Sequence, residues 1–115
     1  MKDPMVYLDH ILEAIGWIEE DTRSGKDVFL HSRLVRDAVL RSLQTLAEST
    51  QRLPDGMKER HPEIDWSGIA SFRNVLVHDY LGLDVEVAWE VIQRDLPHLK
   101  LAVQALRADA PKLEN

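Results

Sequence analysis

The 115-residue sequence contains no cysteine, and this absence excludes a disulfide framework, thiol catalysis and a cysteine-based zinc site together. Glycine and proline are scarce, with five of each, so few turns are available and long elements are favoured. No uninterrupted apolar run approaches the length that crosses a membrane, and the first ten residues lack the apolar core of a signal peptide. We therefore expect a cytoplasmic protein without a membrane segment.

Basic residues are outnumbered, because 14 Lys and Arg stand against 20 Asp and Glu for a formal net charge of −6. This balance counts against a protein that coats nucleic acid through bulk electrostatics. Any RNA contact would need a local basic site, which two chains could assemble, and a basic partner surface explains the charge equally well. The length suits one domain with a hydrophobic core. We expect that domain over residues 1–110, followed by a frayed tail over residues 111–115.

Two long helices are predicted in the first half by apolar residues at i, i+3, i+4 and i+7 spacing. One runs from Met5 to about Thr22, with Asp3 as its N-cap. A short connector over residues 26–31 leads to the second, which Ser32 caps. The inward-facing residues of this second helix are expected to be Val35, Ala38, Val39, Ser42, Leu46 and Leu53.

Two more long helices follow a polar stretch, residues 57–61, that could form one helical turn. The third runs from Asp65 to about Tyr80. The fourth begins at Asp84, and Pro97 should kink it because proline removes one backbone hydrogen bond and crowds the preceding turn. No strand-length alternation appears, so the predicted fold class is all-α, a bundle of four long helices with short connecting helices.

The third helix carries polar side chains among apolar ones. Residues 69–81, IASFRNVLVHDYL, are apolar around the whole circumference, as expected of a helix buried on most sides. Among them lie Arg73, Asn74, His78 and Asp79, whose burial is costly unless they are paired or line a wet cleft. Arg73 and His78 are about 140° apart on an ideal helix, so one straight helix does not aim both at one small target. Either the arginine bends round, or a second copy of the helix completes the site across a two-fold axis.

A purely structural role is the competing interpretation of these residues. A buried arginine often pairs with a core carboxylate such as Glu48, and a single histidine is more often a packed core residue than a catalyst. On spacing alone the structural interpretation is the stronger, because short motifs match by chance. The sequence offers no convincing cluster of histidines and carboxylates, so we expect neither a metal site nor a cofactor.

The segment from Arg73 to Tyr80, RNVLVHDY, resembles the R-x4-H-x-Y motif of the HepT toxin family in the HEPN superfamily. This sequence departs from the family pattern at Ser42, where asparagine is expected. It departs again at residues 47–49, where Ala-Glu-Ser replaces Gly-Glu-Ala and alters the packing around Glu48. Similarity to the family's other helices and connections extends over residues 7–15, 37–41, 52–54, 61–64, 66 and 96–99.

This resemblance implies a metal-independent HEPN endoribonuclease that forms a homodimer, in which two R-x4-H helices line one cleft. It assigns catalysis to Arg73 and His78, orientation of the sugar or the histidine to Asn74, and supporting roles to Glu48 and Asp79. His78 suits proton transfer at a ribose 2′-hydroxyl because imidazole titrates near neutral pH. Arg73 suits the phosphate because its forked donors and fixed charge stabilise negative charge that develops there.

The resemblance also implies a toxin–antitoxin system. HepT toxins are paired with MntA-type minimal nucleotidyltransferase antitoxins, which add AMP to the motif tyrosine, here Tyr80. Such AMPylation would place a bulky anion beside the cleft, where it competes with RNA phosphate. Two alternatives stay open. The chain could be a non-catalytic dimer that binds a nucleotide or partner, as a substrate or subunit of the nucleotidyltransferase, or a plain interaction bundle whose Arg73 and His78 are buried.

Overall fold

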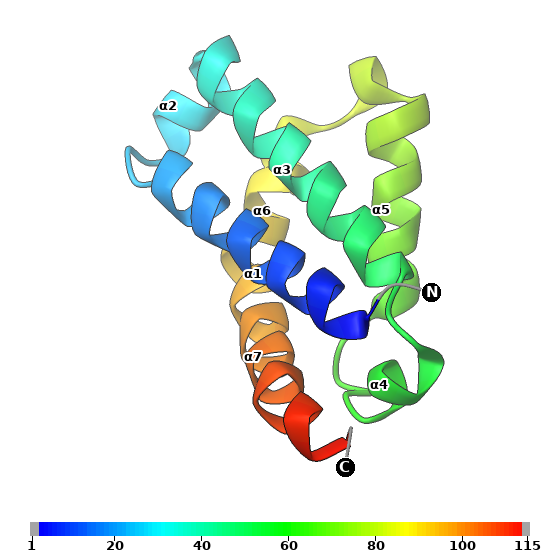
Figure 1. The fold of residues 1–115 in the computed structure, drawn as a ribbon. Helices are drawn as coiled ribbons and strands as arrows, with labels where there is room; N and C mark the ends of the chain where they lie inside the picture. The colour runs from blue at the N-terminus through cyan, green and yellow to red at the C-terminus, as the bar shows by residue number, and fades with distance from the viewer. Residues whose placement is uncertain (1–2, 114–115) are drawn as a thin grey trace.

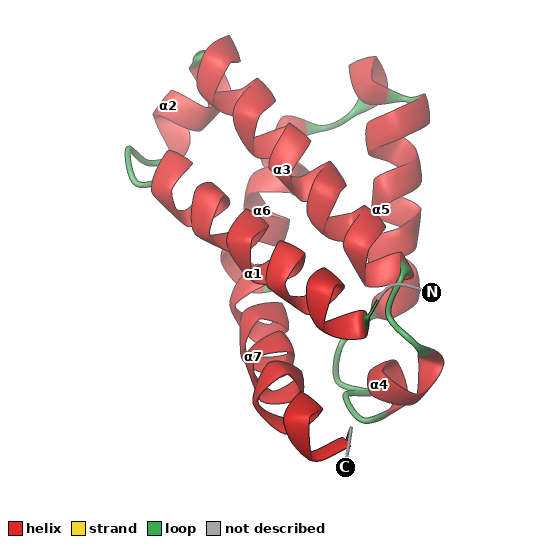
Figure 2. Cartoon of the chain, in the orientation of Figure 1, coloured by secondary structure: helices red, strands yellow, loops and turns green. Residues whose placement is uncertain are grey.

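Every regular element of the computed structural model is helical within residues 3–113, the part of the chain that the structure describes. Short loops join the helices (Figure 2), and the predicted all-α bundle is confirmed. None of the helices in this range combines the length and the apolar character that crossing a membrane requires. The elements are α1 (Pro4–Asp21), α2 (Lys26–His31), α3 (Arg33–Gln51), α4 (Asp55–Glu59), α5 (Trp66–His78), the 3-10 turn η1 (Tyr80–Gly82), α6 (Val85–Arg94) and α7 (Leu96–Leu113).

The central pair of the bundle is α1 and α3, which lie side by side and run in opposite directions (Figure 1). Helix α7 packs along α1, and two ion pairs join them: Lys100 Nζ lies 3.0 Å from Glu19 Oε2, and Arg107 Nε lies 2.7 Å from Asp9 Oδ1. Helix α5 packs on the other side, chiefly against α3. It therefore forms an edge of the bundle.

Both of the first predicted long helices are present with their expected caps. The Asp3 side chain accepts a hydrogen bond from Met5 N, and Ser32 Oγ accepts one from Val35 N. Helix α1 buries Leu8, Ile11, Ala14, Ile15 and Ile18, which lie on one face of the helix as the apolar spacing predicted.

The buried face of α3 is broader than predicted. Val39, Ser42 and Leu46 are buried as expected, and Leu53 is buried just beyond the end of the helix, but Val35 is half-buried and Ala38 faces solvent. Because α3 is flanked by α1, α2 and α5, its buried arc extends through residues that the narrow predicted stripe left out. These are Leu40, Leu43, Ala47, Ser49 and Thr50.

The segment expected to be a plain connector is helix α2. It follows Gly25, whose φ of 94° lies in the left-handed region that favours glycine. Phe29 of this helix is fully buried, and its ring centroid lies 5.5 Å from that of Trp89 on α6. Apolar periodicity cannot be recognised over only six residues, so the sequence did not predict this helix.

The predicted fourth helix is divided in two. Asp84 caps α6 by accepting from Glu86 N at 3.0 Å, as expected. At Asp95 the helix ends, and α7 begins with Leu96 and Pro97, so proline separates two helices where only a kink was predicted. Helix α7 continues to Leu113, into the segment for which fraying was expected; residues 114–115 lie outside the described part. The domain boundary at residue 110 stays a prediction.

Candidate functional site

Helix α5, which carries the R-x4-H residues, is fixed firmly at its start. Asp65 Oδ1 accepts a hydrogen bond from Gly68 N at 2.9 Å and so caps the helix where the sequence predicted. Trp66 Nε1 donates to the carbonyl oxygens of Lys58 and His61, both at 3.1 Å. Further along, Leu76 is the only residue of α5 that is buried. The prediction that α5 is buried on most sides is wrong for a single chain, because α5 lies at the edge and leaves Val75 and Val77 exposed.

The Arg73 guanidinium lies between α5 and α3. Its Nη2 is 3.7 Å from Glu48 Oε1, and its Nη1 donates to Asn74 Oδ1 at 3.3 Å. Glu48 Oε1 also accepts from Gln44 Nε2 at 3.1 Å, which holds the carboxylate in place. The pairing with Glu48, foreseen as the structural alternative, is therefore present. The side chains of Arg73 and Glu48 are 28% and 44% exposed, so the pair lies at the surface of the bundle and not in its core.

Much of the hydrogen-bonding capacity of Arg73 is unused. Its Nε is buried and has no hydrogen-bond partner within the described residues. Arginine carries five N–H donors, and the bond to Asn74 is the one side-chain hydrogen bond found for Arg73 within residues 3–113. Because Glu48 contacts the Arg73 guanidinium on one side and other N–H donors stay unused by the described residues, Arg73 is suited to bind a further anion.

His78 and Asp79 mark the end of α5. His78 is exposed, and its imidazole forms no hydrogen bond or ion pair with any residue that the structure describes. Asp79 leaves the helix with φ −141° and ψ 49°, and its carboxylate lies over the turn that follows. A Cβ at residue 82 would be 2.5 Å from an Asp79 carboxylate oxygen, so a larger residue there would displace the Asp79 side chain.

Tyr80 lies beyond the helix, on η1, whereas the sequence had predicted that α5 runs to this residue. Tyr80 therefore does not continue a helical face of α5. The Tyr80 hydroxyl instead donates to Asp37 Oδ1 on α3, at 2.6 Å. Burial raises the pKa of Tyr80, the hydrogen bond and the charge of Asp37 raise it further, and the Arg36 cation opposes them. Sequence reasoning missed Asp37, whose only signal was its place in the family-like segment 37–41.

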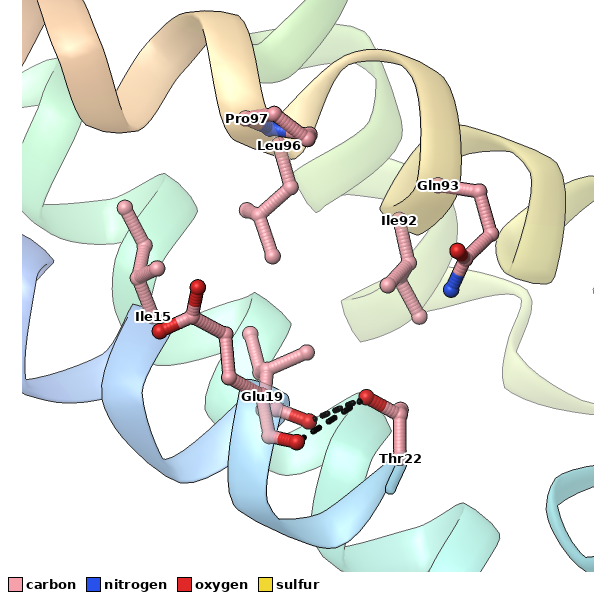
Figure 3. A pocket seen from close by; sticks show the side chains of 8 residues that line it. Ile15, Glu19, Thr22, Ile92, Gln93, Leu96 and Pro97 are labelled. Atoms are coloured by element: carbon pink, nitrogen blue, oxygen red, sulfur yellow. Dashed lines mark hydrogen bonds between the residues drawn. The ribbon is translucent and has the colours of Figure 1, made fainter. Parts of the chain in front are cut away.

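Two pockets of the chain lie away from these residues. One pocket, of about 280 Å³, lies between the end of α1 and the junction of α6 and α7 (Figure 3). Apolar side chains such as Ile15 and Ile92 line it, and the Thr22 hydroxyl at its edge donates to Ile18 O at 2.7 Å. The other lies between α4 and the start of α5. Neither is lined by a residue of the R-x4-H-x-Y motif, so the motif lies on an open surface of the single chain.

The described residues contain no group of three or more His, Cys, Asp or Glu side chains that could hold a metal ion. Two separate contacts join the α5 region to α3: the Arg73 guanidinium, beside Asn74, pairs with Glu48, and the Tyr80 phenol binds Asp37, eleven residues earlier on α3. The His78 imidazole lies at the end of α5, near the second contact in the sequence. The chemistry of these side chains is that of anion binding and proton transfer.

Fold and motif together define an all-helical protein of the HEPN type. The family model described as Ribonuclease HepT-like matches residues 11–106, which include both helices of the site, and the chain belongs to that family. A protein of Thermococcus cleftensis named "Probable ribonuclease HepT" is 40% identical over 102 residues, covering 88% of this chain and 93% of that protein. A protein of Methanocaldococcus jannaschii named "Gamma-glutamylcyclotransferase and putative RNase" is 36% identical over 115 residues, covering 99% of this chain. The chain spans 52% of that longer relative's length. No solved structure gives a significant match.

Proposed function

We propose that this chain is a metal-independent endoribonuclease in which Arg73 and His78 carry out the reaction. One observation carries the proposal: a single exposed helix presents a guanidinium with unused donors and an imidazole with no partner among the described residues. Membership of the Ribonuclease HepT-like family and the names of the relatives support RNA as the substrate. We expect the protein to act in the cytoplasm, where RNA is available.

The proposed reaction is an internal displacement at phosphorus. The ribose 2′-oxygen forms a bond to the adjacent phosphorus, and its proton passes to the His78 imidazole. The bond from phosphorus to the 5′-oxygen breaks, and the leaving oxygen takes a proton from water to become a 5′-hydroxyl. Arg73 stabilises the charge on the non-bridging oxygens through its forked donors. Asn74, which already accepts from Arg73, orients the guanidinium. Because the nucleophile belongs to the substrate, the reaction needs no metal-bound water.

A second copy of the chain completes the site in this proposal. Arg73 turns toward Glu48 on α3, whereas His78 lies at the exposed end of α5, so the two groups do not converge within one chain. Val75 and Val77 are exposed on the two sides of α5 that flank the buried Leu76, which gives a partner apolar surface to cover. A two-fold axis beside α5 would bring the Arg73 of one chain toward the partner's His78.

We also propose that AMP addition at Tyr80 regulates the site. Tyr80 is 42% exposed on the turn next to His78, so an MntA-type nucleotidyltransferase antitoxin could reach its hydroxyl. With that enzyme and ATP, we expect intact-mass measurement to show added AMP on the wild-type chain and on Tyr7→Phe, and none on Tyr80→Phe. Addition that persists in Tyr80→Phe would show that another residue is the acceptor.

The second candidate function is a non-catalytic dimer that is a substrate or subunit of the nucleotidyltransferase. The Arg73–Glu48 pair favours it, because a neutralised arginine can serve structure alone. Incubation of the purified, unmodified protein with RNA in the presence of a chelator separates the two. The endoribonuclease cleaves under these conditions, and His78→Ala does not. Intact RNA after incubation with a folded wild-type protein would favour the non-catalytic dimer.

A further inference from the structure

The end of α5 extends beyond the core of the bundle. Leu76, 3% exposed, is the last buried residue of the helix, and Leu83 is the next one packed against the core. Between them His78 is exposed, and Leu81 is 99% exposed. Beyond the backbone hydrogen bonds of α5 itself, apolar packing therefore does not tie His78 to the bundle, and the interaction that joins this segment to α3 is a polar one.

That interaction is the Tyr80–Asp37 hydrogen bond. Within residues 3–113 it is the one hydrogen bond that joins η1 to α3, and it spans 43 positions of the sequence at 2.6 Å. Its acceptor is a carboxylate, so the bond is charge-assisted and stronger than one between neutral groups. Burial and the neighbouring carboxylate raise the pKa of Tyr80, so its hydroxyl keeps its proton further into the alkaline range than that of a free tyrosine.

Backbone hydrogen bonds through the turn after His78 couple the position of Tyr80 to the end of α5. Asp79 N donates to Val75 O at 2.9 Å, Gly82 N to Asp79 O at 3.1 Å, and Leu83 N to Tyr80 O at 3.2 Å. The Asp79 carboxylate lies over Gly82, within 2.5 Å of where a Cβ at residue 82 would be. A displacement of Tyr80 therefore moves the last turn of α5.

We propose that Asp37 is a positioning residue of the site, which holds Tyr80 and through it the end of α5 that carries His78. The inference rests on the proposed function, and it adds a second effect to AMP addition. When the Tyr80 oxygen bonds to the α-phosphorus of ATP and pyrophosphate leaves, the hydroxyl proton is lost. The modified oxygen can no longer donate to Asp37. The new phosphate also lies beside that carboxylate and is repelled by it. Modification thus releases His78 as well as obstructing RNA.

Two substitutions test the contact in the full-length, unmodified protein. Asp37→Ala and Tyr80→Phe should each lower kcat for RNA cleavage about tenfold and leave KM unchanged, as expected from the loss of one hydrogen bond to a charged group. The double variant should be no worse than either single one, because both remove the same contact. Glu20→Ala and Tyr7→Phe are the matched controls, since Glu20 is an exposed helical carboxylate and Tyr7 the other tyrosine.

Amide hydrogen exchange supplies a readout that does not depend on activity. Exchange over residues 79–83 should be faster in both variants than in the wild type, while α1 and the core of α3 keep their protection. Unchanged exchange there, or additive losses of kcat in the double variant, would overturn the inference. A wild-type chain that cleaves no RNA would refute the proposed ribonuclease, and the exchange experiment would then decide alone whether Asp37 holds the end of α5.

Discussion

Arg73 and His78 lie five residues apart on α5 but have different surroundings. Arg73 is half-buried between two helices, beside Glu48 and Asn74, whereas the imidazole of His78 is in solvent. The sequence predicted the partner of Arg73, because a guanidinium near the core needs a carboxylate. It could not predict the exposure of His78, which depends on where α5 ends and on how α5 sits at the edge of the bundle.

His78→Ala and Arg73→Ala should each reduce RNA cleavage by a factor of about 10²–10⁴, because each removes a group that acts in the transition state. Arg73→Lys should restore little activity, since a point charge cannot reproduce the forked contact. Initial rates on a fixed RNA substrate measure the effect.

Folding is the control for these two variants, since Arg73→Ala also removes the ion pair between α5 and α3. The Arg73–Glu48 pair is partly exposed, so its loss should cost about 1 kcal/mol or less, and circular dichroism and thermal melting should change little. Folded variants that cleave at the wild-type rate would make the motif structural.

The titration of Tyr80 gives a pH-dependent prediction. Burial and Asp37 raise the pKa of Tyr80 in the folded chain, so its contribution to the free energy of unfolding is complete below the pKa of a free tyrosine. The contribution is lost as pH rises through the higher folded value, above about pH 10. Tyrosinate absorbance of the wild type minus that of Tyr80→Phe isolates this group. Asp37→Ala should lower its titration midpoint, and an unaltered midpoint would show that Asp37 does not affect the phenol.

At the scale of helices, the sequence predicted those elements whose signals are local. Periodicity and caps identified α1 and α3, and Asp84 marked the start of α6, whereas Pro97 was expected only to kink one helix and instead lies in the first turn of α7. The end of α5 was placed two residues late, because the apolar pattern continues through η1 and no sequence signal records the turn at Asp79. Asp37 was missed for a different reason: its contact with Tyr80 is tertiary and leaves no mark on periodicity.

Helix α2, which no pattern revealed, should be essential to stability. Phe29→Ala should lower the free energy of unfolding by about 3–5 kcal/mol, because it removes a fully buried ring packed on Trp89. Val28→Ala on the same helix is the control and should cost about 1 kcal/mol or less, since Val28 is exposed. Urea unfolding measures both. Equal small effects would mean that α2 is only a connector.

For the whole molecule, the main question is how an acidic chain with an open site acts on a polyanion. The net charge of −6 gives no general attraction for RNA, so binding has to come from the local cations of the site. One chain supplies Arg73 and His78 on an open edge of the bundle, away from both of the pockets described above. We propose that a homodimer places two sets of Arg73 and His78, one from each chain, in one cleft.

Solution scattering should therefore give the mass of two chains at micromolar concentration, and mixed subunits should test how the site is shared. Arg73→Ala and His78→Ala dimers are each expected to be inactive. Unfolded and refolded together in equal amounts, they should regain about a quarter of wild-type cleavage, because half of the dimers retain one of two sites. A monodisperse monomer would exclude the shared site. A dimer without recovery would place Arg73 and His78 of one chain in the same site.

The most direct test of the central claim is the chemistry of the cut ends. Mass spectrometry of RNA cleaved in chelator by the unmodified protein should find a 2′,3′-cyclic phosphate on one product and a 5′-hydroxyl on the other, both absent with His78→Ala. These ends follow from attack by the 2′-oxygen with proton transfer to His78. Products that carry a 3′-hydroxyl and a 5′-phosphate, or identical products from His78→Ala, would contradict the account.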